Sequence, residues 1–274
     1  MKDLPLIVFT LCMQAAIGAI IWSAIVRLKD KEAPVFKTNT LIALILSIVG
    51  MLASLVHLGK PHLAITSLSN LFSSWLSREI FFSGGFFVLL LIFWWLERTD
   101  KTEGVRNVFC WLAGLAGLVA IFSMGQLYRQ TIMPAWQSAN TFVDFYATAL
   151  ILGAVVLYVA AGKERGRLPR LDLAVLAIVF IQIAFVPGYL ASVGAIPGAG
   201  QESAALLAGS YGVMMVLRWL FVLGGIFLFV LSRTERFANQ VGILYTGVGV
   251  LVVGAFIGRF LFYVSGIPIG IGII

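Results

Sequence analysis

The residues best placed to move protons in this sequence are a histidine and a glutamate at the two ends of one predicted loop. His57 follows an apolar run that ends at Val56, and Glu79 precedes a run that begins at Ile80. An imidazole, whose ordinary pKa is about 6.5, accepts a hydrogen bond from a hydroxyl group and then its proton. A nearby carboxylate orients the ring and passes the proton on. His57 and Glu79 are therefore a candidate acid–base pair, with a hydrogen-bonded interfacial histidine as the alternative for His57.

Further ionisable residues lie at the ends of other apolar runs. Placing such a group inside a membrane costs at least about 2.5 to 3.5 kcal/mol, so each one is a functional candidate. A simpler interpretation of Arg129 and Arg259 is that their side chains reach the lipid headgroups. A simpler interpretation of Asp144 is that it is an acid favoured at the start of a helix. Arg218 needs a partner inside the bundle, for which Glu79 and Asp144 both qualify. The complete set is His57, Glu79, Tyr128, Arg129, Asp144, Arg218 and Arg259.

The composition indicates that helices crossing a membrane must position these residues. Of the 274 residues, 61% are hydrophobic and 11% are charged, against roughly 45 to 50% and about 25% in a soluble domain. Long unbroken apolar runs exclude a soluble globule and lack the alternation of a β-barrel. The net charge of +7 comes from basic residues between the runs, so it does not indicate nucleic-acid binding. Cys12 and Cys110 lie inside apolar runs and predict core packing only.

The apolar runs predict an all-α fold, a polytopic membrane bundle of eight transmembrane helices in a single domain over residues 1–274. A helix needs about 20 apolar residues to cross the hydrocarbon layer. The predicted spans are Leu4 to Val26, Asn39 to Val56, Ile80 to Leu96, Asn107 to Tyr128, Phe145 to Gly162, Leu173 to Val193, Val213 to Ser232 and Phe237 to Gly258.

The basic residues predict how this bundle is oriented. Those near the loops after the first, third, fifth and seventh spans are Arg27, Lys29, Lys31, Lys37, Arg98, Lys101, Arg106, Lys163, Arg165, Arg167, Arg170, Arg233 and Arg236; those at the other end are Lys2, Lys60, Arg78, Arg129, Arg218 and Arg259. Because cytoplasmic loops carry the excess of Lys and Arg, both termini and all the ionisable candidates are expected on the outer side.

The two longest outer connections are also unusually apolar. They run from His57 to Arg78 and from Gly194 to Gly212, and the first contains Leu71, Phe72, Trp75 and Leu76, which we expect to be exposed. An exposed apolar patch usually marks an interface. These connections predict a docking surface for another subunit, with an unpartnered interfacial helix as the alternative.

Oxidation of a lipid-soluble hydroquinone matches this combination of groups. It releases two electrons to a redox centre and two protons to an aqueous face, while apolar walls hold the ring and its tail. A haem usually takes axial histidines from within the spans. The two histidines, His57 and His62, lie outside the apolar cores, so no haem is expected.

Several motifs occur in the same order as in a known family. Val56-His57-Leu58-Gly59-Lys60-Pro61 and Leu76-Ser77-Arg78-Glu79-Ile80 are followed by Tyr128 with Pro134-Ala135-Trp136, then by Ser210-Tyr211-Gly212 before Arg218, and by Ile257-Gly258-Arg259 with Phe262-Tyr263. The sequence resembles the membrane anchor subunit of the dimethyl sulfoxide reductase family over its whole length. It departs from that pattern at Ala255, where an acid often precedes the final Gly-Arg pair.

The resemblance implies a haem-free subunit of an oxidoreductase complex in the bacterial cytoplasmic (inner) membrane, used in anaerobic respiration. It implies that His57 and Glu79 carry out menaquinol oxidation, and we infer that Tyr128, Arg218 and Arg259 contribute to the same quinol site. Electrons would pass to a partner iron–sulfur subunit and then to a molybdopterin catalytic subunit, so the clusters and molybdopterin belong to partners. The terminal electron acceptor stays open, because this subunit does not contact it.

A polytopic small-solute transporter is the alternative function. It would need a polar cavity at the membrane midplane and broken helices there. Gly84-Gly85 and Gly224-Gly225 offer flexibility, but glycine in membrane helices more often permits close packing.

Overall fold

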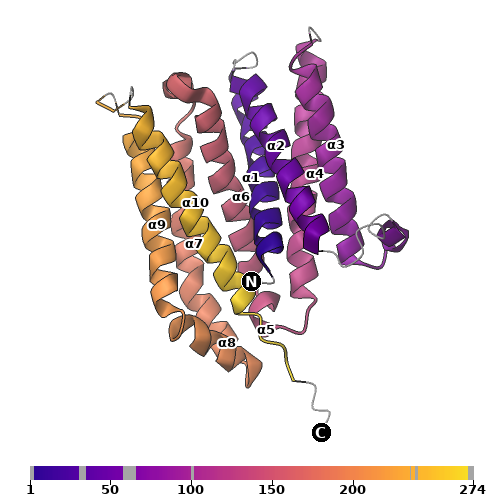
Figure 1. Ribbon diagram of the computed structural model, residues 1–274, viewed down its shortest axis with the longest axis vertical. Helices are drawn as coiled ribbons and strands as arrows, with labels where there is room; N and C mark the ends of the chain where they lie inside the picture. The colour runs from indigo at the N-terminus through magenta and orange to yellow at the C-terminus, as the bar shows by residue number, and fades with distance from the viewer. Residues whose placement is uncertain are drawn as a thin grey trace.

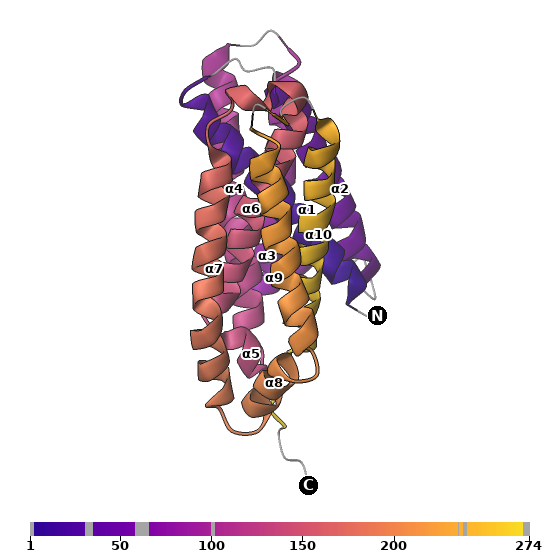
Figure 2. The same cartoon turned by 90° about the vertical axis from the view of Figure 1, so that its left-hand side faces the viewer.

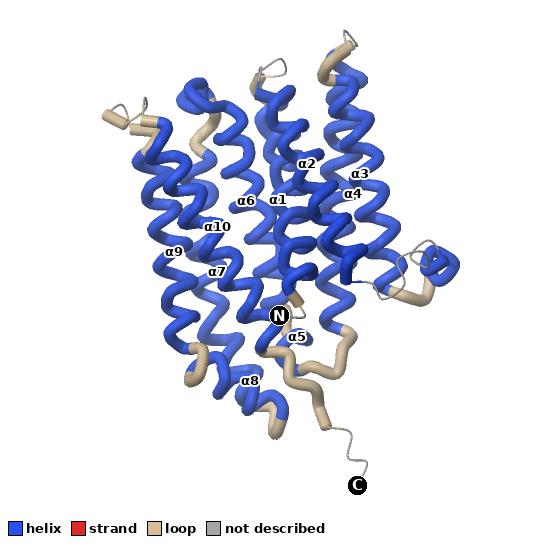
Figure 3. Tube along the Cα trace, in the orientation of Figure 1, coloured by secondary structure: helices blue, strands red, loops and turns tan. Residues whose placement is uncertain are grey.

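The structure, a computed structural model, describes residues 3–30, 35–57, 66–99, 102–234, 236–237 and 240–270. The side chains of residues 57, 67 and 68 lie outside this description. Within these ranges every regular element is helical, as the sequence predicts (Figure 3).

Eight of the helices are long and apolar enough to cross a membrane, which confirms the predicted number within the described residues. They are α1 (Leu4–Arg27), α2 (Val35–His57), α3 (Trp75–Leu96), α4 (Glu103–Arg129), α6 (Asn140–Ala161), α7 (Leu171–Gly194), α9 (Gly212–Leu231) and α10 (Val241–Val264).

Three helices differ from their predicted bounds in a way that changes the site. The helix α3 begins at Trp75 instead of Ile80, because the Ser74 side chain accepts a hydrogen bond from the Ser77 amide and caps the first turn. The helix α6 begins at Asn140 instead of Phe145, and α10 ends at Val264 instead of Gly258. These differences move charged residues from the ends of the helices to positions inside them.

The helices α1 and α6 form the centre of the bundle, with α3 and α4 on one flank and α7, α9 and α10 on the other (Figure 1). Glycines set the closest approach of the central pair: a Cβ atom placed on Gly153 would lie 2.1 Å from the carbonyl carbon of Gly18. Only residues without a side chain allow this contact, as is common between membrane helices. Glycines also let α9 and α10 approach each other, at Gly225 and Gly254, where a Cβ atom would lie 2.7 to 2.8 Å from the facing helix.

Short helices cover one end of the bundle, where the first and last described residues also lie (Figure 2). They are η2 (Thr66–Asn70), α5 (Pro134–Gln137) and α8 (Ala199–Ala208). Phe72, which is 91% exposed, and Leu76 are exposed as predicted. The prediction is wrong for Leu71 and Trp75, which are half-buried; the Arg78 guanidinium lies 4.2 Å from the centre of the Trp75 ring and covers it.

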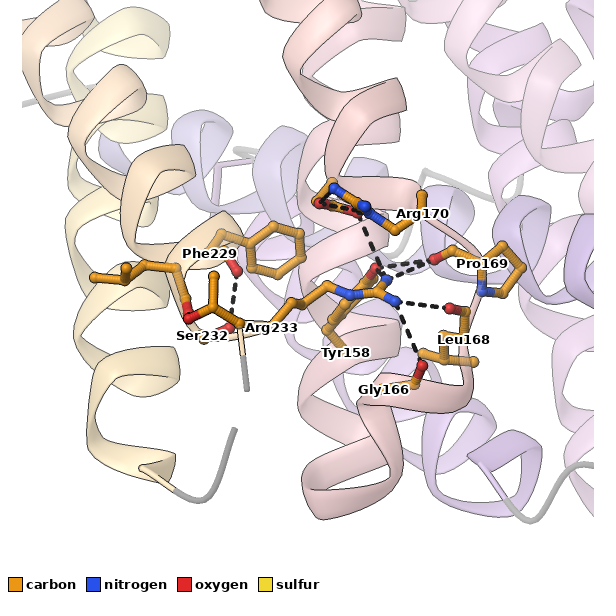
Figure 4. Close-up of polar contacts among 11 residues, drawn as sticks. Tyr158, Gly166, Leu168, Pro169, Arg170, Phe229, Ser232 and Arg233 are labelled. Atoms are coloured by element: carbon orange, nitrogen blue, oxygen red, sulfur yellow. Dashed lines mark hydrogen bonds and ion pairs between the residues drawn. The ribbon is translucent and has the colours of Figure 1, made fainter. Parts of the chain in front are cut away.

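The opposite end, which we call the basic end, is formed by the connections after α1, α3, α6 and α9, where η3 (Gly162–Arg167) also lies. There Arg27 pairs with Glu97, and both side chains are buried. Arg233, just after α9, donates to the carbonyl oxygens of Pro169 at 2.7 Å and Leu168 at 3.0 Å and contacts the Tyr158 hydroxyl (Figure 4). These bonds close the bundle at this end.

Asp172 at the start of α7 completes the Arg233 cluster. Its carboxylate lies 3.6 Å from Arg233 and accepts hydrogen bonds from the exposed guanidinium of Arg170. These hydrogen bonds and the charge of Asp172 raise the pKa of Arg170 above its ordinary value. The buried carboxylate of Asp172 is therefore paired with two cations.

Candidate functional site

The candidate site lies at the end opposite the basic end, which we call the site end, and Glu79 is its central acid. Because α3 begins at Trp75, Glu79 lies one turn inside the helix, where it is 7% exposed. Its Oε2 atom is buried and has no hydrogen-bond partner among the described residues. Burying an unpaired carboxylate is costly, so this oxygen needs a proton or a donor from elsewhere.

The predicted partner of Glu79 lies at the edge of what the structure describes. The backbone of His57 ends α2, which packs beside α3 at the site end. The side chain of His57, and residues 58–65 with His62, lie outside the described residues. The pairing of His57 with Glu79 stays a prediction.

Two tyrosines, Tyr128 near the end of α4 and Tyr263 near the end of α10, lie close to Glu79. The hydroxyl groups of Tyr128 and Tyr263 are 2.6 Å apart, and Glu79 lies close enough to interact electrostatically with both. The rings of Trp136, Phe145 and Phe262 surround Tyr128 with centroid separations of 5.1 to 5.7 Å. Aromatic packing of this kind fixes ring positions, so the two hydroxyl groups are held in place.

Arg259 is buried rather than directed to the headgroups. The sequence places it at the end of the eighth span, but α10 continues to Val264 and leaves Arg259 only 1% exposed. Its Nη2 donates to Gln14 Oε1 at 2.6 Å, and its guanidinium carbon lies 4.0 Å from the centre of the Phe145 ring. Arg259 Nε, Arg259 Nη1 and Gln14 Nε2 are buried without a hydrogen-bond partner among the described residues.

Arg218 pairs with Asp144, one of the two acids that the sequence offered. Asp144 lies one turn inside α6, so the interpretation as an exposed helix-start acid is wrong: it is 6% exposed and also accepts a hydrogen bond of 2.7 Å from Gln182 Nε2. A cavity of about 20 Å³ adjoins all three side chains. Gly258 leaves room for the arginine, because a Cβ atom there would lie 2.7 Å from Arg218 Nε.

The predicted site residues thus fall into separate groups. Glu79 and Tyr128 lie together, Arg218 binds Asp144 between α6 and α9, and Arg259 lies close enough to interact electrostatically with both the tyrosine pair and Asp144. Arg129 is exposed and donates to the Gln137 carbonyl oxygen at 3.0 Å, outside these groups. No three His, Cys, Asp or Glu side chains within the described ranges are grouped to hold a metal ion.

Sequence reasoning missed the two buried glutamines. Gln14 and Gln182 carry no charge, so a search for ionisable residues passes over them. The available signal is that each is a lone polar residue in a long apolar run, where an amide needs an interhelical partner. Both glutamines bind a residue of another helix, Arg259 or Asp144.

Comparisons with known proteins point to one family. A profile of the family described as "DMSO reductase anchor subunit (DmsC)" matches residues 1–265. The protein is 31% identical to the C subunit of the anaerobic dimethyl sulfoxide reductase of Haemophilus influenzae, over 95% of its own length and 94% of that relative. It is 27% identical to the YnfH subunit and 26% identical to the C subunit of anaerobic dimethyl sulfoxide reductase in Escherichia coli, with 98% of its own length and 96% of each relative covered.

Proposed function

The protein belongs to the family of dimethyl sulfoxide reductase anchor subunits, and from that premise we propose that it binds and oxidises menaquinol at the site end of its bundle. The observation that carries the proposal is the buried Glu79 carboxylate, whose Oε2 has no partner within the described residues. It lies near the end of the membrane-spanning region, in the helix that packs beside α2 and its terminal His57.

The reaction needs groups that take protons from a ligand in an apolar site. Menaquinol loses two electrons and two protons, and both of its O–H bonds break. We assign His57 as the first proton acceptor and Glu79 as the group that orients it and relays the proton outward. The Tyr128–Tyr263 pair holds two hydroxyl groups near Glu79, which supports hydrogen bonding to the ligand.

The electrons leave this subunit for its partners. An anchor subunit of a dimethyl sulfoxide reductase complex implies a catalytic partner. We propose that an iron–sulfur subunit docks at the site end, over the connections that expose Phe72 and carry α8, and passes electrons to a molybdopterin subunit. The clusters and the molybdopterin belong to those partners, and under this proposal the anchor itself holds no haem.

The proposal also places the complex in the cell. The eight apolar helices and the family indicate a multi-pass membrane protein. We propose the bacterial cytoplasmic membrane, with the site end outward as the basic residues predict. Protease treatment of intact outer-membrane-permeabilised cells tests this: the iron–sulfur partner is cleaved if it lies outside, and its protection contradicts the assignment.

The central experiment measures menaquinol oxidation by the assembled complex with His57→Ala and Glu79→Gln. Each change should lower turnover about 100-fold or more, the usual contribution of a general base. Glu202→Gln and His62→Ala are the matched controls, since Glu202 is an exposed acid at the same end. Wild-type rates and inhibitor binding in both test variants, with partners still bound, would refute the site.

A further inference from the structure

A wholly apolar groove lies between α1, α2, α6 and α10, and its lining includes Ala15, which is next to Gln14, and Ala255, which is one turn from Arg259. Its volume is about 270 Å³. Residues of all four helices line it, among them Leu11, Cys12, Leu46, Val155, Val252 and Ala255.

Helix periodicity connects this groove with the buried polar pair. Arg259 is four residues after Ala255 and seven after Val252, so the three share one face of α10. On α6, Phe145 is seven residues before the lining residue Leu152, and the guanidinium carbon of Arg259 lies 4.0 Å from the centre of the Phe145 ring. On α1, Gln14 lies between the lining residues Cys12 and Ala15. The polar pair therefore lies beside the groove, with Arg259 and Phe145 toward the site end.

Arg259 and Gln14 have hydrogen-bond donors without an acceptor among the described residues. Arg259 Nε, Arg259 Nη1 and Gln14 Nε2 are buried and have no acceptor among the described residues. Buried polar atoms in folded proteins are nearly always paired. An acceptor oxygen on a ligand would satisfy them, and the apolar groove beside them fits a hydrocarbon tail.

From this arrangement we infer that Arg259 and Gln14 bind an oxygen of the quinone ring and that the groove holds the first part of its isoprenoid tail. The inference rests on the proposed function and adds to it a second oxygen subsite, a tail path and a role for Gln14. A quinone fits better than a phospholipid, because Gln14 lies ten residues into α1, about 15 Å along the helix axis. An uncharged ring reaches that depth, whereas a charged phosphate stays at the membrane surface.

Cys12 provides a test of binding that does not depend on turnover. It lines the groove and is half-buried, whereas Cys110, the other cysteine of the sequence, is fully buried. In the complex held in phosphatidylcholine vesicles, a small lipophilic maleimide should label Cys12 more slowly when long-tailed menaquinone is added. Tail-less 2,3-dimethyl-1,4-naphthoquinone, which has no free ring position for thiol addition, should not slow it, and a Cys12→Ser variant gives the background labelling.

Two results of this measurement would overturn the inference. Labelling that menaquinone does not slow shows that the tail lies elsewhere. Labelling that is already blocked without quinone, and is released only by removing phospholipid, shows that a lipid acyl group occupies the groove.

Steady-state kinetics with the long-tailed and the tail-less quinol, which share one ring type, separate the tail from the oxygen subsite. Ala255→Phe fills the groove and should raise KM about tenfold for long-tailed menaquinol while leaving KM for the tail-less quinol unchanged. Val253→Phe, on an exposed face of the same helix, is the control and should change neither value. Gln14→Leu should raise KM for both quinols about three- to tenfold.

These outcomes distinguish failure of the inference from failure of the proposed function. Equal KM values for the two quinols in Ala255→Phe, together with lost turnover in Glu79→Gln, refute the groove alone. Intact turnover in Glu79→Gln and His57→Ala refutes the acid–base assignment, and the Cys12 labelling still decides whether a quinone tail lies in the groove.

Discussion

Arginines are buried at both ends of this bundle, but their surroundings differ. At the basic end, Arg233 donates to two loop carbonyl groups and pairs with Asp172. At the site end, Arg259 donates to Gln14, and two of its nitrogens have no partner among the described residues. Because buried polar atoms are rarely left unpaired, the contrast supports a structural role for Arg233 and the proposed ligand-binding role for Arg259.

The largest expected difference is in the change of stability when Glu97 and Glu79, the two buried glutamates among the described residues, are replaced. Glu97→Gln removes the charge that pairs with Arg27 and should lower the free energy of unfolding by about 3 to 5 kcal/mol. Glu79→Gln removes a carboxylate whose Oε2 is unpaired among the described residues and should leave stability unchanged or higher. Denaturant unfolding in detergent measures both, and equal losses would contradict the contrast between the ends.

The glycine beside Arg218 should have a smaller effect. A methyl group at Gly258 would lie 2.7 Å from Arg218 Nε and push the guanidinium away from Asp144. We expect Gly258→Ala to cost about 1 to 3 kcal/mol. Gly249→Ala in the same helix is the control: a Cβ atom there has no atom within 4 Å, so that change should be neutral or stabilising. Equal stabilities of the two variants would argue against the tight fit.

Removing one tyrosine hydroxyl group at each end compares the strength of the hydrogen bonds at the two ends. Tyr158→Phe removes a hydrogen bond to the charged Arg233, which should cost about 1.5 to 3 kcal/mol. Tyr263→Phe removes only bonds to neutral hydroxyl groups, of which the bond to Tyr128 should cost about 0.5 to 1.5 kcal/mol. Thermal unfolding of the two variants should rank them in this order, and the reverse ranking would contradict the assignment of the tighter polar network to the basic end.

The smallest effects are expected where the ends are alike. Arg98 at the basic end and Arg129 at the site end are both exposed and donate to backbone carbonyl groups. Replacing either by alanine should change the free energy of unfolding by no more than about 0.5 kcal/mol. A larger loss of the free energy of unfolding in only one of the two variants would show that the two ends also differ at the surface.

The sequence was sufficient for the number of spans, because about twenty consecutive apolar residues have few other uses. It was also sufficient to predict that Arg218 pairs with an acid, because a cation inside a span needs one. Asp144 was one of the two candidates. It could not choose between Asp144 and Glu79, because that depends on which helix faces α9. The choice follows from the order of packing, with α6 in the centre and α3 on the far flank.

The depth of Arg259 and the role of Gln14 could not be predicted either, and the reason is different. Apolar residues continue on both sides of Arg259, so hydropathy alone does not show whether the helix ends there. Gln14 gains its importance from a residue 245 positions away, a separation that no local pattern reports. The pairing of His57 with Glu79 stays a prediction, because the His57 side chain lies outside the described residues.

The attachment of Arg233 to the connection between α6 and α7 has a consequence for how the protein is made. The arginine and the Pro169 carbonyl group are 64 residues apart, so the ribosome has released that connection well before its partner exists. The turn between the fifth and sixth membrane crossings therefore lacks its hydrogen bonds from Arg233 until the seventh crossing has been inserted. Final closure of this end is a late event of biogenesis, and a nascent polypeptide truncated before residue 233 lacks it.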